Sequence, residues 1–165
     1  MAGTMTIEEV EARLREGVPG GVVELQRAPY SPHLVVDSVR IREVCLFLRD
    51  DEALRFDYLT HLTGLDTGER LCTVYRVLTL MHKRTVAMRA YVPRENPVID
   101  TISDIWASAG WFERESYDLL GIRYRGHPDL RRLLLPEDWE GHPLRKDYVD
   151  PLRYQDIDNT RDYGI

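Results

Sequence analysis

The sequence predicts an α+β fold: a two-layer domain with a mixed, mostly antiparallel sheet, followed by short helices and an extended C-terminal segment. Three observations lead to this prediction. Helical spacing of apolar residues occurs in two places, strand-like alternation occurs in several others, and the last part of the chain shows neither pattern. The predicted order is α-β-β-α-β-β-β, and helices beside a mostly antiparallel sheet form two layers. We expect an α+β domain at residues 1–120 and an extended tail at 121–165.

The first helix is marked at both ends. Thr6-Ile7-Glu8-Glu9 has the form of a capping box, in which a Thr hydroxyl and a Glu carboxylate satisfy unpaired backbone N–H groups at the helix start. Gly17 before Pro19 ends the pattern. Short strands are expected next at Val22–Gln26 and His33–Val36, separated by turn residues.

A second amphipathic helix is expected at Ser38–Arg49, where apolar residues recur at i, i+3, i+4 and i+7 from Ile41. A meander of three strands should follow. Its members are the segment containing Phe56, Tyr58 and Leu62, then Leu71–Leu80, then Thr85–Val92.

Two short helices are expected after the meander. Ser103 can cap the first, which would run through Ala109. The second would span Trp111–Leu120 and end at Gly121, because glycine accepts the left-handed conformation at a helix end. Trp106 and Trp111 are expected to pack in the core or at a hinge.

Composition excludes several classes of protein. The 165 residues are 43% apolar and 30% charged, which is typical of a globular chain. A net charge of -6 argues against a nucleic-acid module, which would bind with strong salt dependence through a basic face. No apolar run approaches the roughly 18–20 residues that span a bilayer, and the N-terminus resembles neither a secretory signal nor a transit peptide. Cys45 and Cys72 are expected to be small buried hydrophobes, which fits a reducing compartment.

Glu113, Glu115 and Asp118 form the densest acidic cluster. One hypothesis is a carboxylate pair for acid–base catalysis, since a nearby like charge raises the pKa of one partner. The other is a structural role, with Glu115 and Asp118 on one helix face. Arg114 and the following arginines would then hold the carboxylates ionised, the wrong state for a general acid. We favour ion pairing.

The five histidines are scattered through the chain. They show no zinc or iron–sulfur spacing, and the sequence has no phosphate-binding loop or GxSxG motif. Two of them, His127 and His142, lie in Gly-His-Pro tripeptides, where glycine and proline fix a bend. We expect hydrogen-bonding roles for them. The alternative is a free-standing acid/base enzyme that uses Glu113 or Glu115 with His127 or His142.

The stretch from Trp111 to Tyr148 combines many Arg, Trp and Tyr residues with little apolar sequence of its own. Such side chains dominate protein–protein contacts. Its charge is uneven, basic between Gly121 and Leu135 and acidic from Pro136 onward. This pattern is typical of docking against a complementary protein surface. We therefore interpret residues 121–165 as a partner-docking tail.

A series of short motifs runs through this stretch. They are Glu113-Arg114-Glu115, Tyr117-Asp118, Gly121-Ile122, Gly126-His127-Pro128-Asp129-Leu130-Arg131-Arg132, Leu134-Leu135-Pro136-Glu137-Asp138-Trp139 and Gly141-His142-Pro143-Leu144-Arg145-Lys146-Asp147-Tyr148. Together they resemble the signature of the 30 kDa (C) subunit of respiratory complex I, the proton-pumping NADH:quinone oxidoreductase. The match is specific over about Trp106–Pro151, and the element order upstream is similar to that of the family.

The resemblance implies a non-catalytic structural subunit of the hydrophilic arm of that complex. This chain would bind no cofactor, while the assembled complex would use NADH or another donor, FMN, iron–sulfur clusters and quinone. Its partners would be the 49 kDa-type quinone-site subunit and neighbouring iron–sulfur subunits. It would lie peripherally on the cytoplasmic side of the bacterial inner membrane. The chain ends at Ile165, soon after the signature, and we expect an unfused bacterial subunit.

Related subunits serve F420H₂ dehydrogenases, membrane-bound hydrogenases and the photosynthetic NDH complex, so the resemblance does not fix the electron donor. The predicted partner-contact residues are Glu113, Arg114, Glu115, Tyr117, Asp118, His127, Arg131, Arg132, Trp139, His142, Arg145, Lys146 and Tyr148. The four basic residues from Arg131 to Lys146 would supply charge, and Trp139 and Tyr148 would supply apolar contacts.

Overall fold

A computed structural model describes residues 5–158 of the chain. The helices are α1 (Ile7–Gly17), the 3-10 turn η1 (Ser38–Arg40), α2 (Ile41–Asp50) and α3 (Ala109–Leu120). The strands are β1 (Val22–Gln26), β2 (His33–Val36), β3 (Tyr58–Asp66), β4 (Arg70–Thr79), β5 (Arg84–Pro93), β6 (Val98–Asp100), β7 (Arg123–Arg125), β8 (Arg153–Tyr154) and β9 (Ile157–Asp158).

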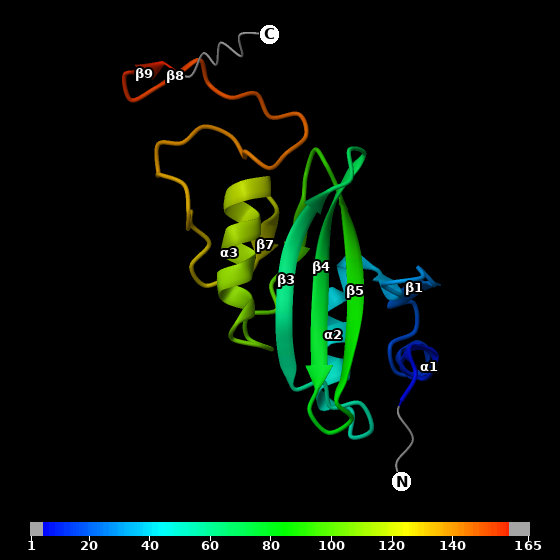
Figure 1. The fold of residues 1–165 in the computed structure, drawn as a ribbon. Coiled ribbons are helices and arrows are strands. Elements are labelled where there is room, and N and C mark those ends of the chain that lie inside the picture. The colour runs from blue at the N-terminus through cyan, green and yellow to red at the C-terminus, as the bar shows by residue number, and fades with distance from the viewer. Residues whose placement is uncertain (1–4, 159–165) are drawn as a thin grey trace.

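The predicted mixed, mostly antiparallel sheet is confirmed. Five strands lie in the order β1-β2-β5-β4-β3, and only the β2–β5 pair of this sheet is parallel. Figure 1 shows α2 behind β4 and β5, α1 beside the β1 edge, and α3 beside the β3 edge. The helices and the sheet therefore form the two layers that the sequence predicts.

The capping box at the start of α1 is also confirmed. The Thr6 backbone N–H donates to the Glu9 carboxylate at 2.6 Å, and the Glu9 N–H donates to the Thr6 hydroxyl at 3.2 Å. Three apolar side chains of α1, including Val10 and Leu14, are buried against the rest of the core. Burial of one such side chain contributes about 1.5–3 kcal/mol, so packing outweighs helix propensity here.

One face of the sheet forms the centre of the core. Tyr75 and Val77 of β4 and Met88 of β5 are fully buried on this face, in one cluster with Val44 and Leu48 of α2. Their alternation with more exposed neighbours follows the two-residue repeat of a strand. The opposite face of the central strands carries a different set of side chains, described below.

Two local predictions in the first half of the chain need correction. The helix expected at Ser38–Arg49 is divided into η1 and α2, because the Asp37 side chain caps the 3-10 turn by accepting from the Val39 N–H. Phe56 lies before β3 and not in it; it is fully buried, and its carbonyl accepts a hydrogen bond from Trp106 Nε1. A register shift after Leu59 also breaks the simple alternation of β3.

The helix expected from Ser103 to Ala109 does not form. Residues 103–108 form turns, and α3 begins at Ala109. Trp106 packs in the core as expected, but Trp111 is 62% exposed. Helix α3 turns its buried side toward the sheet, and this rotation leaves Trp111 on the solvent side.

The strands β6 and β7 were not predicted, and they pair in parallel. Ile122 and Tyr124, which flank the start of β7, are 0% and 2% exposed and belong to the core cluster. Residues 121–125 thus pack as part of the α+β domain. Residues 126–158 continue around the end of α3 with little regular structure (Figure 1).

Candidate partner-docking site

The candidate site begins where α3 ends. Gly121 adopts φ +75° at the helix C-terminus, and its N–H donates to the Tyr117 carbonyl. A Cβ at this position would lie 2.6 Å from the His142 ring, so glycine is needed for both conformation and space. The chain can therefore turn sharply and later return across the helix end.

Asp118 holds the returning chain from inside. Its Oδ2 accepts hydrogen bonds from the backbone N–H groups of Leu133, Leu134 and Leu135 at 2.7–2.9 Å. Its Oδ1 lies 2.7 Å from Arg132 Nη1 in an ion pair. Burial acts to raise the pKa of Asp118, but the three N–H donors and the guanidinium together lower it. Asp118 is thus a buried, ionised carboxylate.

The tail also satisfies the last carbonyl groups of α3, which have no partner within a helix. His142 Nδ1 donates to the Asp118 carbonyl at 2.9 Å, Leu144 N–H donates to the Leu119 carbonyl at 3.0 Å, and Arg145 Nε donates to the Leu120 carbonyl at 2.8 Å. A guanidinium also interacts favourably with the negative end of the helix dipole. Desolvation lowers the pKa of His142, which favours the neutral ring in this position.

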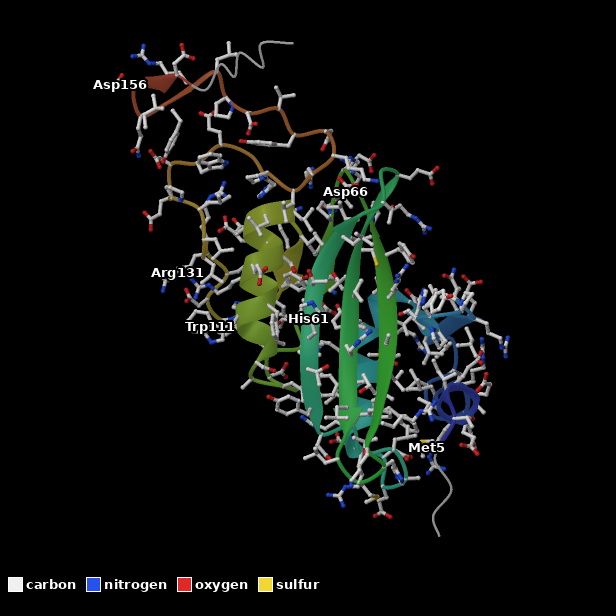
Figure 2. The ribbon with its side chains drawn as sticks, in the orientation of Figure 1. Met5, His61, Asp66, Trp111, Arg131 and Asp156 are labelled. Atoms are coloured by element: carbon white, nitrogen blue, oxygen red, sulfur yellow. The ribbon has the colours of Figure 1, made fainter. Side chains whose placement is uncertain are left out.

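A third contact joins the tail to the turn between β3 and β4. The Asp66 carboxylate accepts from the Lys146 N–H at 2.8 Å and pairs with Arg94 at 2.6 Å. Arg94 also pairs with Asp147 of the tail at 2.5 Å. The Arg94 hydrogen bond holds the pKa of Asp66 well below its usual range. Figure 2 shows Asp66 at the end of the sheet that faces the tail.

The outer side of the tail is different in character. Five apolar side chains there are between 59% and 84% exposed, and α3 adds Trp111. They are Leu134, Leu144, Val149, Leu152 and Ile157. An apolar set of this kind on an otherwise polar segment marks a binding surface more often than scattered single exposures do.

The structure divides the predicted contact residues into two groups. Arg132 and Arg145 turn inward, whereas Arg131 is 68% exposed in its side chain and pairs, among the described residues, only with Asp129. Lys146 is exposed, and its backbone makes the contact to Asp66. Figure 2 shows Arg131 and Trp111 on the side of α3 that points away from the sheet.

The remaining predicted residues of the tail and of α3 are mostly half-buried. The Trp139 ring packs on the Tyr154 ring with centroids 4.9 Å apart, and the Tyr148 ring lies over Gly141. The Tyr117 ring meets the His142 ring edge-on. Arg114 donates to the carbonyls of Arg131 and Arg132 and stacks near Trp111.

One expectation about the acidic cluster is wrong, and another needs refinement. Glu115 and Asp118 lie three residues apart on α3, but Glu115 is exposed and Asp118 is fully buried, so the two carboxylates are in different environments. Arg114 does not pair with Asp118 but lies 3.7 Å from Asp129. The tail supplies the cation for Asp118 from Arg132, a partner that helix geometry alone cannot reveal.

Glu113 was expected to be ion-paired with arginine, and this is also wrong. It is fully buried, accepts from the Ile102 N–H at 2.8 Å and from the Thr101 hydroxyl, and has its nearest basic group, His127 Nε2, at 3.9 Å. Burial raises the pKa of Glu113 to about 7. A carboxyl without a guanidinium partner in an apolar setting keeps its proton into the neutral range.

The structure brings Glu113 and His127 together but does not place Glu115 or His142 with them. A cavity of about 650 Å³ is lined by Thr101, Ser103, Gly110 and His127 among others, but Glu113 does not line it. His127 Nε2 donates to the Gly110 carbonyl, and its Nδ1 accepts from the Asp129 N–H. Both ring nitrogens are therefore engaged by backbone, which leaves neither free to exchange protons with a substrate.

The described part of the chain shows three further features. Among residues 5–158, no group of three or more His, Cys, Asp or Glu side chains is arranged to hold a metal ion. None of the helices in that range is long and apolar enough to cross a bilayer. Cys45 and Cys72 are both free and buried, as expected.

Sequence reasoning missed the exposed apolar side chains of the tail. The signal was present, because Leu144, Val149 and Leu152 occur in a segment with no helical or strand repeat. An apolar residue outside any periodic pattern has no predicted core to join. Its exposure could have been inferred on that ground.

Comparison with known proteins shows that the chain is similar in sequence to one family of respiratory-chain subunits. Residues 34–154 match the sequence profile of the family described as respiratory-chain NADH dehydrogenase, 30 Kd subunit. The C subunit of the NADH-quinone oxidoreductase of Chloroherpeton thalassium is 42% identical over 82% of this chain, which spans 58% of that protein. The C subunit of the same oxidoreductase in a Roseiflexus species is 38% identical over 88% of this chain and 84% of its own length.

Solved structures agree with these sequences. A trypsin-resistant fragment of Nqo5 has a TM-score of 0.60 at 31% identity and covers 73% of this chain and 98% of the fragment. A chain of an archaeal membrane-bound sulfane sulfur reductase has a TM-score of 0.71 at 20% identity, with 86% and 85% covered, and shares the fold. The chain spans about three-fifths of the length of the first curated relatives that it matches.

The fold places the chain in the class of α+β subunits that includes Nqo5. The match over most of the chain makes the assignment specific. The chain belongs to the family of the 30 kDa subunit of the respiratory-chain NADH dehydrogenase.

Proposed function

We propose that the chain is a non-catalytic structural subunit of the hydrophilic arm of a proton-translocating NADH:quinone oxidoreductase. In this role residues 126–158 dock onto the 49 kDa-type quinone-site subunit and onto neighbouring iron–sulfur subunits. The protein would sit peripherally on the cytoplasmic side of the bacterial inner membrane. The electron carriers, which are FMN, iron–sulfur clusters and quinone, would belong to the partners.

One observation carries the proposal: the two sides of the tail differ. Buried polar groups of α3 and the β3–β4 turn hold its inner side, so its backbone is fixed before any partner binds. Its outer side exposes Leu134, Leu144, Val149, Leu152 and Ile157. A pre-ordered segment that displays apolar side chains binds with a smaller loss of conformational entropy.

The electron donor of the assembled complex is a separate question. The same docking surface would serve in an F420H₂ dehydrogenase, a membrane-bound hydrogenase or a photosynthetic NDH complex. The names of the curated relatives support NADH as the donor. Purification of the intact assembly and identification of its electron-input subunit would distinguish these alternatives.

The double variant Leu134→Asp/Leu144→Asp tests the docking role in cells that make the whole complex. Both side chains are exposed, so the isolated chain should keep its unfolding midpoint while the amount of assembled arm falls. The matched control is Leu80→Asp/Met81→Asp, which places the same charges on exposed apolar residues of the β4–β5 turn. The control should assemble normally. Normal assembly and quinone reductase activity in the tail variant would contradict the proposal.

A second candidate function, a free-standing acid/base enzyme, is favoured by one observation. His127 lines the cavity and lies 3.9 Å from the buried Glu113, whose pKa burial raises to about 7. This candidate predicts turnover or tight small-molecule binding by the purified chain alone, with loss of both in Glu113→Gln. The engagement of both His127 nitrogens by backbone makes it the weaker candidate.

A further inference from the structure

The outer face of the central strands is a second surface, separate from the tail. It consists of the side chains of β3, β4 and β5 that alternate with the buried core set. Figure 1 shows no described helix on the viewer's side of β4 and β5, while α2 lies behind them. The residues on this face are Tyr58, His61, Thr63, Leu65, Arg70, Cys72, Val74, Arg76, Leu78, Thr85, Ala87, Arg89 and Tyr91.

Three arginines give this face its charge. The register places Arg89 opposite Val74 and Arg76 opposite Ala87, and Arg70 stacks over the Tyr91 ring at 4.5 Å. Within residues 5–158, none of these three guanidinium groups forms an ion pair, although twelve other arginines of that range do. Across the sheet from Arg89, the strand register leads through Val35 of β2 to Glu24 of β1. The Glu24 carboxylate accepts a hydrogen bond from the Gln26 side chain.

Unpaired arginines are a minority in this chain. The chain carries 28 acidic and 22 basic residues, so carboxylates are in excess. Twelve of the nineteen arginines in residues 5–158 form ion pairs, and the three on this face are among the seven that do not. Three arginines on one sheet face that pair with no described acid therefore indicate a local positive patch, which would favour a negatively charged partner.

Apolar side chains lie between the arginines. Leu65 is 41% exposed and Tyr58 is 56% exposed, while Val74, Leu78 and Tyr91 are half-buried. Cys72 is fully buried on this face, and burial raises the pKa of its thiol to about 11, although Arg89 and Arg70 act to lower it. Apolar contact area with arginine at its centre is the composition of a protein–protein interface.

We propose that this face binds a carboxylate-rich surface of a protein partner. Arg76 and Arg89 would pair with Asp or Glu side chains, and Val74, Leu65 and Tyr91 would pack against apolar groups between those acids. A mixed apolar and basic face on a chain with a net charge of -6 suits a protein partner better than a polyanion. The inference rests on the sheet alone and stands apart from the docking role of the tail.

The test combines charge reversal with site-specific cross-linking in cells that make the full assembly. A photo-reactive residue at Ala87, which lies beside Arg76, should join the chain to a peptide containing Asp or Glu. The variant Arg76→Glu/Arg89→Glu should reduce that cross-link about tenfold or more, since separating close charge pairs at an interface weakens binding strongly. Lysine substitutions at the acids of the captured peptide should restore it.

The matched control is Arg55→Glu/Lys83→Glu, which makes the same change in net charge at exposed cations outside the face. It should leave the cross-link unchanged. The unfolding midpoint of the purified chain should not differ between the two double variants, which separates binding from folding. A cross-link to lipid, to nucleic acid or to a peptide without acids would overturn the proposal, and so would a reversal variant that cross-links as the wild-type chain does.

Discussion

The domain at residues 5–125 and the folded-back segment at 126–158 are held by different forces. The domain is held by apolar side chains, thirty of which form one buried cluster. The segment contributes one partly buried apolar side chain to that cluster, Leu130, and is held mainly by hydrogen bonds to Asp118, Asp66 and the last carbonyls of α3. The difference shows that a few well-placed acceptors can order a segment whose apolar groups point outward.

The variant Asp118→Ala should have the largest effect, because it releases the folded-back segment from the domain. It leaves Arg132 and three backbone N–H groups without their acceptor, and breaking a buried pair costs about 3–5 kcal/mol. We expect residues 131–146 to become sensitive to trypsin while the sheet stays folded by circular dichroism. Glu115→Ala on the exposed face of α3 is the control and should change stability by less than about 0.5 kcal/mol. Equal resistance of residues 131–146 to trypsin in both variants would show that Asp118 does not hold the segment.

Glu113→Gln tests how the stability of the domain at residues 5–125 depends on pH. Burial raises the pKa of Glu113 from 4.5 to about 7, so the native state keeps a proton that the unfolded chain has already lost. The contribution of the protonated Glu113 to the free energy of unfolding is fully present below pH 4.5. It is lost as the pH rises to 7, a change of about 3 kcal/mol. Glutamine cannot ionise, so the free energy of unfolding of the variant relative to wild type should rise by up to that amount between pH 5 and pH 8. Denaturant titrations at both pH values measure this difference, and parallel curves would contradict it.

Gly121→Ala sharpens the comparison at the boundary between the two regions. A Cβ would meet the His142 ring at 2.6 Å, and φ is +75°. Gly68→Ala has φ +96° but no atom within 4 Å, so it carries the backbone strain without the clash. The left-handed conformation costs about 1–2 kcal/mol in either variant. We expect Gly121→Ala to lose more stability than Gly68→Ala, because the clash with His142 adds to the backbone strain. It should also release the tail, as measured by thermal unfolding and proteolysis.

Arg131→Ala should have the smallest effect on folding. Its side chain is 68% exposed and pairs, among the described residues, only with the exposed Asp129, so stability should change by less than about 0.5 kcal/mol. Arg132→Ala, one residue further, should destabilise clearly more because it removes the Asp118 partner. If Arg131 contacts a partner as predicted, its variant should impair arm assembly in cells despite normal folding. Normal assembly would remove Arg131 from the docking site.

Most of the fold was predictable because its signals are local. The Thr6 capping box, the helical repeat from Ile41 and the alternation along β4 and β5 each report on a few neighbouring residues. The predictions at Phe56 and Ser103 were wrong for different reasons. The Phe56 carbonyl accepts a hydrogen bond from the distant Trp106 ring, which no local pattern reveals. The Ser103 N–H donates to the Thr101 hydroxyl, and residues 103–108 form turns in place of a helix. The parallel β6–β7 pair has three residues in each strand, too few to show a repeat.

The candidate site was predictable only in part. The motifs identified the family, and the docking role of their segment stays a prediction; Arg131 and Lys146 are exposed, which such a role requires. The inward direction of Arg132 and Arg145 depends on the path of the tail around α3, which no short-range pattern encodes. Neutralisation of Glu113 likewise follows from its burial, a property of the completed core.

The parallel pairing of β2 with β5 has a consequence for synthesis on the ribosome. The edge of β2 that β5 covers stays open until the whole β3–β4 hairpin and β5 itself have been made, because Leu34 pairs with Met88. Contacts between residues so distant in sequence slow folding. The emerging chain therefore exposes an unpaired strand edge for several seconds at typical rates of translation, of about 5–20 residues per second, and an unpaired edge favours aggregation during that interval.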